Sequence, residues 1–333
     1  MPPKRLPKLP QLLDRKIYKT GQTRGADDDV IFQNRVSRAS TVLIPYALWQ
    51  ACGKPHDGQF KYENSFIVLV SPRTYFSGAD ITAELSAKGL TIGVNAVVFY
   101  ETREQWEANN PESMKWKPAK SRTRPLGGQF IARISATTAA KDGGRIIRGF
   151  DTTSNKGAGI RVYEYASTET SAKCRLQLEA LFWLCDDSEK VAVANGMKTT
   201  EAETRKSAIL SQCDDQGLLD KAQLKVSRIL NKRGRTICPL CLDELSGQGF
   251  FNRMEQAEGR EVPDLTITQL NLFHIAELRY GVLNHRPYNL GWGHHHCNVV
   301  VKDSGLIETL EWMRTVLDRN IQEGHLPSAK SAS

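Results

Sequence analysis

The feature that most constrains this chain is a cluster of cysteine and histidine between Cys238 and Asp303. Five of the seven histidines fall between Phe273 and Cys297, and three of the seven cysteines (Cys238, Cys241 and Cys297) lie between Cys238 and Asp303. A hydrophobic core does not need these residue types side by side. Both are favoured zinc ligands, and histidine is also the usual general base near neutral pH. The window therefore predicts a metal-stabilised domain that carries chemistry.

Two pairs of potential zinc ligands share the same internal spacing. Cys238-Pro-Leu-Cys241 can grip one ion from a tight turn, and His294-x-x-Cys297 supplies a second pair. Together they make a tetrahedral set of three sulfurs and one nitrogen, which is a normal structural zinc site. Because four protein ligands leave no open position, we expect this zinc to hold the fold and to take no part in catalysis.

An alternative is a catalytic zinc site formed by the run His294, His295 and His296. Consecutive residues of a strand point to opposite faces, so these three side chains cannot easily converge on one ion. We therefore favour the structural site. Which of the three histidines faces the metal stays open at this stage.

The residues between the two ligand pairs predict a strand, a loop, a second strand and a helix. Leu272–Ile275 forms a plausible strand, and a return strand begins with Asn289–Trp292. A helix is expected from about Asn298 to Lys302, directly after Cys297.

This order of residues resembles the HNH nucleases of the ββα-metal fold. The resemblance covers Cys238–Lys302, about a fifth of the chain. It implies hydrolysis of DNA phosphodiester bonds with one divalent cation, Mg²⁺. By position, His274 matches the general base that activates water, Asn289 the residue that orients this base, and Asn298 the metal ligand on the helix.

The chemistry suits these residue types, with one departure from the family pattern. An imidazole titrates in the right range to take a proton from water, and Mg²⁺ prefers oxygen ligands such as an amide. The family commonly has Asp or His just before the base, as a second metal ligand, whereas this chain has Phe273. We take Glu277 as the substitute ligand, with Asn271 and Asp303 as alternatives.

The remainder of the chain resembles type II restriction endonucleases of the BstXI kind. Three segments carry this resemblance: Glu63–Pro72, Asn95–Trp106 and His285–His294. It implies a homodimer that cuts both strands of double-stranded DNA at a palindromic or interrupted-palindromic site, since a two-fold dimer reads symmetric DNA naturally.

The net charge of +8 is unevenly shared along the chain. Residues 1–150 hold 23 Lys and Arg against 13 Asp and Glu, whereas the remainder holds 22 against 24. A one-sided basic surplus is typical of a surface that meets phosphates. The strongest candidate is the basic segment 115–124, which carries a tryptophan and five DNA-binding candidates: Lys115, Lys117, Lys120, Arg122 and Arg124.

The apolar pattern predicts an α+β protein. Four apolar runs between glycine-rich turns indicate strands and favour a β-barrel or sandwich, with a short helix near Ala79–Lys88: Ser65–Val70, Thr91–Tyr100, Gln129–Ile134 and Gly159–Tyr163. Helical spacing follows in four later segments: Ser171–Leu184, Thr199–Cys213, Leu218–Leu230 and Leu306–Leu317. The predicted parts are a basic arm (1–40), a β-rich DNA-recognition domain (41–166), a helical connector (167–235), an HNH nuclease domain with structural zinc (236–322) and a tail (323–333).

Composition excludes several classes of protein. An odd number of cysteines in a long chain argues against a disulfide scaffold, no apolar run approaches the roughly 18 residues that span a bilayer, and no Walker-type phosphate loop is present. The first residues lack an apolar signal stretch. We expect a cytoplasmic enzyme without a nucleotide cofactor.

Two further functions remain open beside the restriction enzyme. A modification-dependent HNH nuclease would share the chemistry and add an aromatic cage, for which Trp106 and Trp116 are candidates. A non-catalytic zinc-finger-like regulator, favoured by Phe273, would bind DNA without cutting it.

Overall fold

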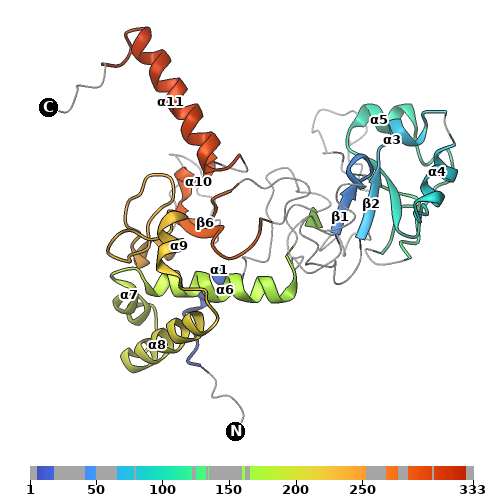
Figure 1. Ribbon diagram of the computed structural model, residues 1–333. Helices are drawn as coiled ribbons and strands as arrows, with labels where there is room; N and C mark the ends of the chain where they lie inside the picture. Colours follow the sequence, from blue (N-terminus) through green and yellow to red (C-terminus); the bar gives the residue numbers. More distant parts are fainter. Residues whose placement is uncertain are drawn as a thin grey trace, which may run out of the picture. The chain divides into compact units, whose positions relative to one another are not determined.

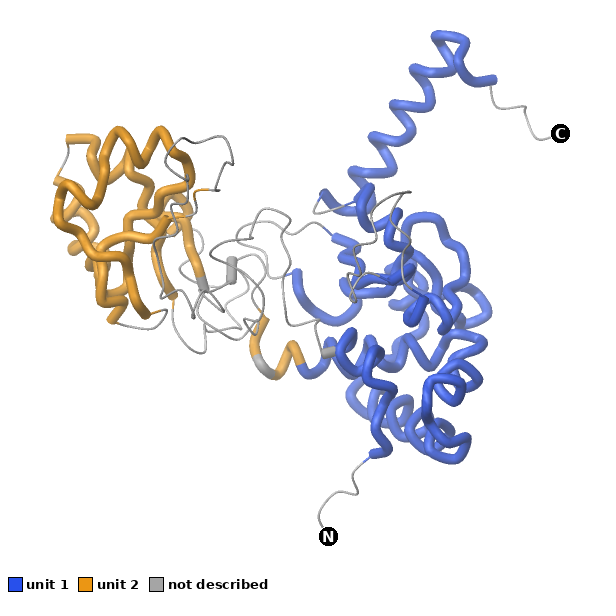
Figure 2. Tube along the Cα trace, turned by 180° about the vertical axis from the view of Figure 1, so that it is seen from behind, with its two compact units in different colours: residues 1–18, 172–278, 284–333 blue, residues 19–171, 279–283 orange. Residues whose placement is uncertain are grey.

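The computed structural model describes eleven stretches of the chain, which cluster into two compact units (Figure 2). The described residues are 6–18, 42–49, 66–78, 80–121, 125–132, 134, 160–161, 166–252, 268–276, 284–301 and 304–327. Unit 1 comprises Met1–Tyr18, Ala172–Leu278 and Asn284–Ser333, and unit 2 comprises Lys19–Ser171 and Arg279–Leu283.

Unit 2 is built on a parallel sheet of five strands (Figure 1). The strand order is β4-β3-β2-β1-β5, and every neighbouring pair is parallel. The strands are β1 Val42–Pro45, β2 Phe66–Val70, β3 Ala96–Tyr100, β4 Phe130–Ala132 and β5 Ile160–Arg161. The prediction of a β-barrel or sandwich is therefore wrong, and the chain is a mixed α/β protein.

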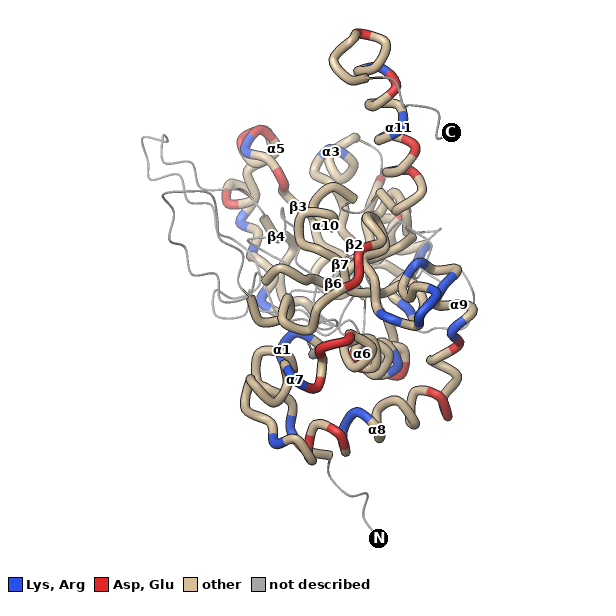
Figure 3. Tube along the Cα trace, turned by 90° about the vertical axis from the view of Figure 1, so that its left-hand side faces the viewer, with Lys and Arg blue, Asp and Glu red and all other residues tan. Residues whose placement is uncertain are grey.

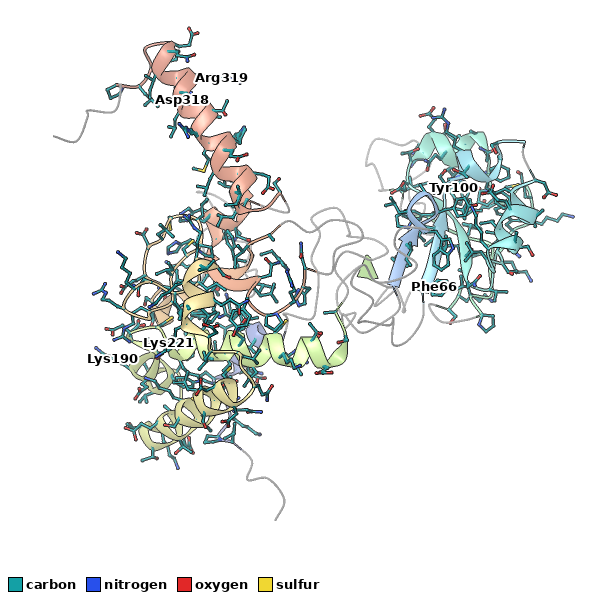
Figure 4. All side chains as sticks on the ribbon, in the orientation of Figure 1. Phe66, Tyr100, Lys190, Lys221, Asp318 and Arg319 are labelled. Atoms are coloured by element: carbon teal, nitrogen blue, oxygen red, sulfur yellow. The ribbon has the colours of Figure 1, made fainter. Side chains whose placement is uncertain are left out.

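The parallel arrangement follows from strands that are buried on both faces. All five residues of β3 are buried, and Tyr100 at its end is fully enclosed (Figure 4). Val97 and Phe99 join one hydrophobic cluster, whereas Val98 and Tyr100 join another on the opposite face. Burial raises the pKa of Tyr100 to about 12, so this residue is a neutral phenol that donates to the Asn109 carbonyl at 2.8 Å.

Short capped helices follow the strands of unit 2. Ser71 ends β2 and accepts a hydrogen bond from the Thr74 amide, which starts α3 (Pro72–Tyr75). After β3, Thr102 and the side chain of Gln105 form a capping box that starts α5 (Arg103–Ala108). The remaining helical elements are η2 (Tyr46–Leu48) and α4 (Ile81–Ala87). The helix predicted near residues 79–88 corresponds to α4.

Unit 1 combines helices with a two-stranded hairpin around one hydrophobic core. The elements are α1 Gln11–Tyr18, α6 Thr168–Trp183, α7 Ser188–Ala194, α8 Thr199–Asp215, α9 Lys221–Val226, η4 Gly247–Phe250, β6 Leu270–His274, β7 Leu290–His294, α10 His295–Val301 and α11 Leu306–Gln322. The four helices predicted from periodicity correspond to α6, α8, α9 and α11, and α7 was not predicted.

Helix α6 contributes to the hydrophobic core of unit 1 and contacts the hairpin formed by β6 and β7. Leu178, Leu181 and Phe182 are fully buried, and the indole of Trp292 in β7 donates to the Leu178 carbonyl at 2.8 Å. The Gln177 side chain accepts from the Tyr288 amide at 2.8 Å, just before β7 begins. The helical segment and the Cys/His region, separated at residue 235 in the sequence interpretation, thus share one core.

Helix α1 also belongs to this core, although residues 1–40 read as a basic arm. The helix begins at Gln11, directly after Pro10, where a proline does not interrupt hydrogen bonding. Leu13 is fully buried, and the Lys16 ammonium donates to the Leu270 carbonyl of β6. Residues 6–18 are therefore a packing element of unit 1.

Among the described residues, no helix is both long and apolar enough to cross a membrane.

Candidate metal centre and active site

The turn that carries Cys238 and Cys241 has a closed backbone geometry. The Leu242 amide donates to the Cys238 carbonyl at 2.9 Å, and the Cys238 amide donates to the Asp243 carbonyl at 2.9 Å. Leu242 has a φ of +66°, a conformation that reverses the chain within the turn. Ile237 pairs with Glu244 across the base. The turn thereby presents two thiols from four consecutive residues.

The four predicted zinc ligands lie together. The Sγ atoms of Cys238, Cys241 and Cys297 and a ring nitrogen of His294 all fall within 4.8 Å of one another. Zn–S bonds of 2.3 Å place the corners of a tetrahedron about 3.8 Å apart, so the cluster has the size of a zinc site. His294 ends β7, Cys297 lies in the first turn of α10, and the Cys turn closes the cluster from the other side.

The pKa shifts within the cluster favour uncharged side chains. Burial and the nearby Cys238 raise the pKa of the Cys297 thiol, and burial raises the pKa of Cys241. Burial and the nearby His296 lower the pKa of His294, so its imidazole is neutral at pH 7. Neutral imidazole is the ligand form, and a bound cation favours the thiolate forms of the cysteines.

Of the three consecutive histidines, only His294 lies in the cluster. His295 contacts the side chain of Asn271 through Nδ1 at 2.7 Å. His296 is exposed and stacks on His294 with ring centroids 5.4 Å apart. The three rings thus have different partners, which disfavours a catalytic three-histidine zinc site.

The hairpin and helix predicted after the Cys turn are β6, β7 and α10. The strands are antiparallel, with His274 opposite Leu290 and Leu270 opposite His294. Helix α10 begins at His295, three residues earlier than predicted, because β7 passes directly into it. Cys297 therefore lies inside the helix rather than in front of it.

Phe273 is fully buried in the core of unit 1. It faces Gly291 and Gly293 of β7, and a Cβ atom on Gly293 would lie 2.6 Å from the Phe273 ring. The absence of a side chain at Gly293 thus makes room for this phenylalanine. The position that holds a metal ligand in the HNH pattern is here part of the hydrophobic core.

Asn289 ties together the two ends of the loop that joins β6 to β7. Its side-chain oxygen accepts from the Ala276 amide at 2.7 Å, and its side-chain nitrogen donates to the Asn284 carbonyl at 2.7 Å. Its own carbonyl accepts from the Ile275 amide at 3.0 Å. Asn289 thus fixes the backbone immediately after His274.

His274 lies at the end of β6 and contacts a second histidine. Its Nε2 atom is 3.3 Å from Nδ1 of His285, which is almost fully buried. The sequence interpretation gave His285 no role. Its place in the histidine-rich window, next to the stretch that resembles restriction enzymes, was the available signal.

The predicted ligands of the catalytic metal are only partly described. Asn298 is half-buried on α10, one turn after His295, so it shares the side of the helix from which His295 contacts Asn271 of β6. Glu277 and Asp303 lie outside the described residues. Asn271, the other alternative, is hydrogen-bonded to His295.

The basic segment lies along the edge strand of the unit 2 sheet. The Lys117 carbonyl accepts from the Gln129 amide at 2.8 Å, and the Ala119 amide donates to the Phe130 carbonyl of β4 at 2.8 Å. Gly128 permits this approach, since a Cβ atom there would lie 2.3 Å from the Pro118 backbone. Lys115, Lys117 and Lys120 are exposed on this ordered frame, and Arg122 and Arg124 lie outside the described residues.

The two tryptophans considered for an aromatic cage have packing partners. Trp106 is 7% exposed and contacts Tyr100 and Phe130 edge to face. Trp116 stacks on Phe76 with centroids 5.7 Å apart and meets Tyr75 edge to face. Trp106 is therefore a core residue, and Trp116 anchors the basic segment.

Comparison with known proteins identifies a family. A family model of the BstXI restriction endonuclease matches residues 15–295, which is most of the chain. The searches of curated proteins and of solved structures find no match. The match spans both units, including the parallel sheet, the basic segment and the Cys/His region as far as His295. The chain therefore belongs to the BstXI restriction endonuclease family.

Proposed function

We propose that this protein hydrolyses DNA at a specific sequence through an HNH-type centre formed by β6, β7 and α10. Membership of the restriction endonuclease family indicates a sequence-specific DNA endonuclease that depends on a divalent metal. The observation that supports the HNH assignment most strongly is the Asn289 side chain, which bonds the backbone just beyond His274 at 2.7 Å. The adjoining zinc-type cluster holds the same hairpin and helix.

In this proposal His274 takes a proton from the attacking water. A half-buried imidazole at a strand end can meet a water molecule and a phosphate from solvent. Asn289 keeps the base in place because it fixes the loop from both ends. The cluster of Cys238, Cys241, His294 and Cys297 would hold a structural Zn²⁺ and fix the start of α10.

Asn298 and Glu277 are the proposed ligands of a catalytic Mg²⁺. An amide and a carboxylate supply the oxygen atoms that this ion prefers. When bound, Mg²⁺ supplies positive charge to the phosphate and to the leaving oxygen. Asn298 suits this role because it shares a side of α10 with His295, which contacts β6.

Incubation of the purified protein with unmodified phage DNA tests the proposed function. We expect a set of discrete fragments with Mg²⁺ and none after chelation of Mg²⁺. A continuous smear would contradict sequence specificity. DNA binding without cutting under any divalent metal would favour the zinc-finger-like regulator, and cutting confined to modified phage DNA would favour the modification-dependent nuclease.

We further propose that the basic segment binds the DNA backbone. Replacement of Lys115, Lys117 and Lys120 by glutamine should reduce the slope of log affinity against log salt by about 2 to 3, because each lost phosphate contact contributes about 0.9. Fluorescence anisotropy of a labelled duplex across a salt series measures this slope.

The matched control for this prediction removes three exposed lysines from unit 1: Lys190, Lys198 and Lys221. Figure 3 shows that the α7–α8 region, near two of them, carries acidic as well as basic residues. The control should leave the salt slope close to that of the parent protein. An equal fall in both variants would contradict the assignment of DNA binding to the basic segment.

We also propose that two copies act together, because a two-fold dimer reads symmetric DNA naturally. Helix α11 extends away from the rest of unit 1 (Figures 1 and 2). Leu306, Leu310, Met313 and Leu317 repeat at intervals of four and three residues, the spacing of helices that pair with one another. Leu306 and Leu310 pack on the core of unit 1, whereas Leu317 is 51% exposed, so the far end of this stripe is available to a second copy.

Light scattering tests the dimer. The parent protein should have twice the mass of the 37.3 kDa chain, and Leu317→Glu should shift it toward one chain. Thr315→Glu adds the same charge at an exposed position off this stripe and should leave the dimer intact. A parent protein of one chain's mass at assay concentration would contradict the proposal.

A further inference from the structure

The contact between His274 and His285 has the geometry of one hydrogen bond. Nε2 of His274 and Nδ1 of His285 are 3.3 Å apart. The ring planes are tilted by 51° with centroids 5.5 Å apart, so the rings meet through their edges rather than their faces. His285 is only 1% exposed, whereas His274 is half-buried. The buried ring therefore lies behind the accessible one.

The direction of this hydrogen bond determines whether His274 can act as a base. A neutral imidazole carries one proton, on either Nδ1 or Nε2. If His274 donates from Nε2, its Nδ1 keeps a lone pair that can accept a proton from water. If His285 donates instead, the neutral His274 ring carries its proton on Nδ1 and cannot accept another there.

We propose that His285 is a positioning residue that accepts a hydrogen bond from Nε2–H of His274 and so makes Nδ1 of His274 the proton acceptor. This inference rests on the proposed function, in which His274 activates the attacking water. It adds a residue to the site for which the sequence resemblance gave no counterpart.

Hydrogen bonds to the backbone hold the segments of His274 and His285 next to each other. Asn289 donates to the carbonyl of Asn284, the residue before His285, and accepts from the amide of Ala276, two residues after His274. Its two bonds are both 2.7 Å long. The Ile275 carbonyl also accepts from the Leu306 amide at 2.9 Å. One asparagine thus fixes the separation of the segments that carry both histidines.

The pair of His274 and His285 accounts for the proton that water loses in the hydrolytic step. Water transfers a proton to Nδ1 of His274 while its oxygen forms the new bond to phosphorus, and the bond from phosphorus to the leaving oxygen breaks. The leaving oxygen takes a proton from solvent. His274 is then an imidazolium, whose Nε2–H bond to His285 strengthens because the donor is charged. The contact is therefore stronger after proton transfer than before it.

Two variants of His285 separate the hydrogen bond from simple packing. Asparagine places an acceptor oxygen where Nδ1 of His285 lies, and leucine has the same branching without a polar atom. We expect His285→Leu to lower the single-turnover cleavage rate by about 10- to 100-fold, the usual effect of losing a group that orients a functional histidine. His285→Asn should retain most of the rate, and both variants should bind DNA with the affinity of the parent.

These rates are measured on a plasmid that carries one site mapped with the parent enzyme, with His274→Ala run beside them. A parent-like rate from His274→Ala would refute the proposed function itself. An inactive His274→Ala beside a parent-like His285→Leu would refute only the role of His285. Equal losses in His285→Asn and His285→Leu would also refute it, because the acceptor would then not matter.

A second measurement needs neither DNA nor a stable variant of His285. Nitrogen NMR of the histidine rings in the parent protein reports which ring nitrogen carries the proton, and the spectrum of His274→Ala assigns the His274 signals. We expect neutral His274 to carry its proton on Nε2. A proton on Nδ1 would overturn the proposal even if His285→Leu failed to fold.

Discussion

Replacing Cys297 by serine is expected to remove zinc from the protein and to unfold unit 1 well below the melting temperature of the parent. The Cys297 Sγ atom lies within 4.8 Å of the other three ligand atoms, and its residue is buried in the first turn of α10. Structural zinc contributes about 10 to 16 kcal/mol to the folding of small zinc domains. Even part of this loss should lower the melting temperature by more than about 10 °C in a unit of this size.

Differential scanning calorimetry and atomic absorption check this prediction together. Cys213→Ser is the matched control, because Cys213 is also fully buried in unit 1 but lies outside the cluster. Burial raises the pKa of Cys213 to about 12, as expected for an inert core thiol. The control should keep one zinc per chain and lose only about 1 to 3 kcal/mol for a buried hydroxyl. A Cys297→Ser protein with full zinc content and the parent's melting temperature would contradict the zinc assignment.

The Cys/His centre could be predicted from sequence because its geometry is largely local. Equal spacing in Cys238–Cys241 and His294–Cys297 indicates two pairs that can each reach one ion, and the structure brings all four together. The hairpin followed by a helix was predicted for the same reason. The choice of His294 over its neighbours needed tertiary information, because it depends on the contact of His295 with Asn271.

The architecture of unit 2 was not predicted, although part of the signal was present. The strands were found, but strand order and direction depend on contacts between distant segments that no local pattern encodes. The run Ala96–Tyr100 contains no polar position and is buried on both faces, which is typical of parallel sheets rather than barrels. This unbroken apolar run is therefore a better indicator of the parallel α/β sheet than the glycine-rich turns are.

Two details of the candidate active site could not be predicted because they depend on the folded chain. The contact of His274 with His285 crosses a loop whose ends are joined by Asn289, so it exists only in the folded chain. The burial of Phe273 depends on the space left by Gly293 on the neighbouring strand. A glycine at position 293, inside an otherwise apolar strand, was the one local sign that a large side chain packs there.

Replacing His274 by alanine is the second change from which we expect a very large effect. The proposed role of this residue is to remove a proton from water, and general base catalysis contributes about 100- to 10,000-fold to a rate. The side chain is half-buried at the end of β6 and lies outside the four-ligand cluster. The variant should therefore fold, keep its zinc and bind DNA while its cleavage rate falls by that factor.

His325→Ala provides a matched control, because His325 is exposed beyond the end of α11. It should cut DNA at the parent's rate. A general loss of activity in both variants would point to handling or folding rather than to catalysis.

The most direct test of the HNH assignment is the single-turnover cleavage rate of zinc-loaded His274→Ala with saturating Mg²⁺ on a DNA fragment that carries one mapped site. Our account predicts a rate at least about 100-fold below that of the parent, with unchanged zinc content and DNA affinity. Cleavage by this variant at the parent's rate would contradict the assignment of His274 as the general base.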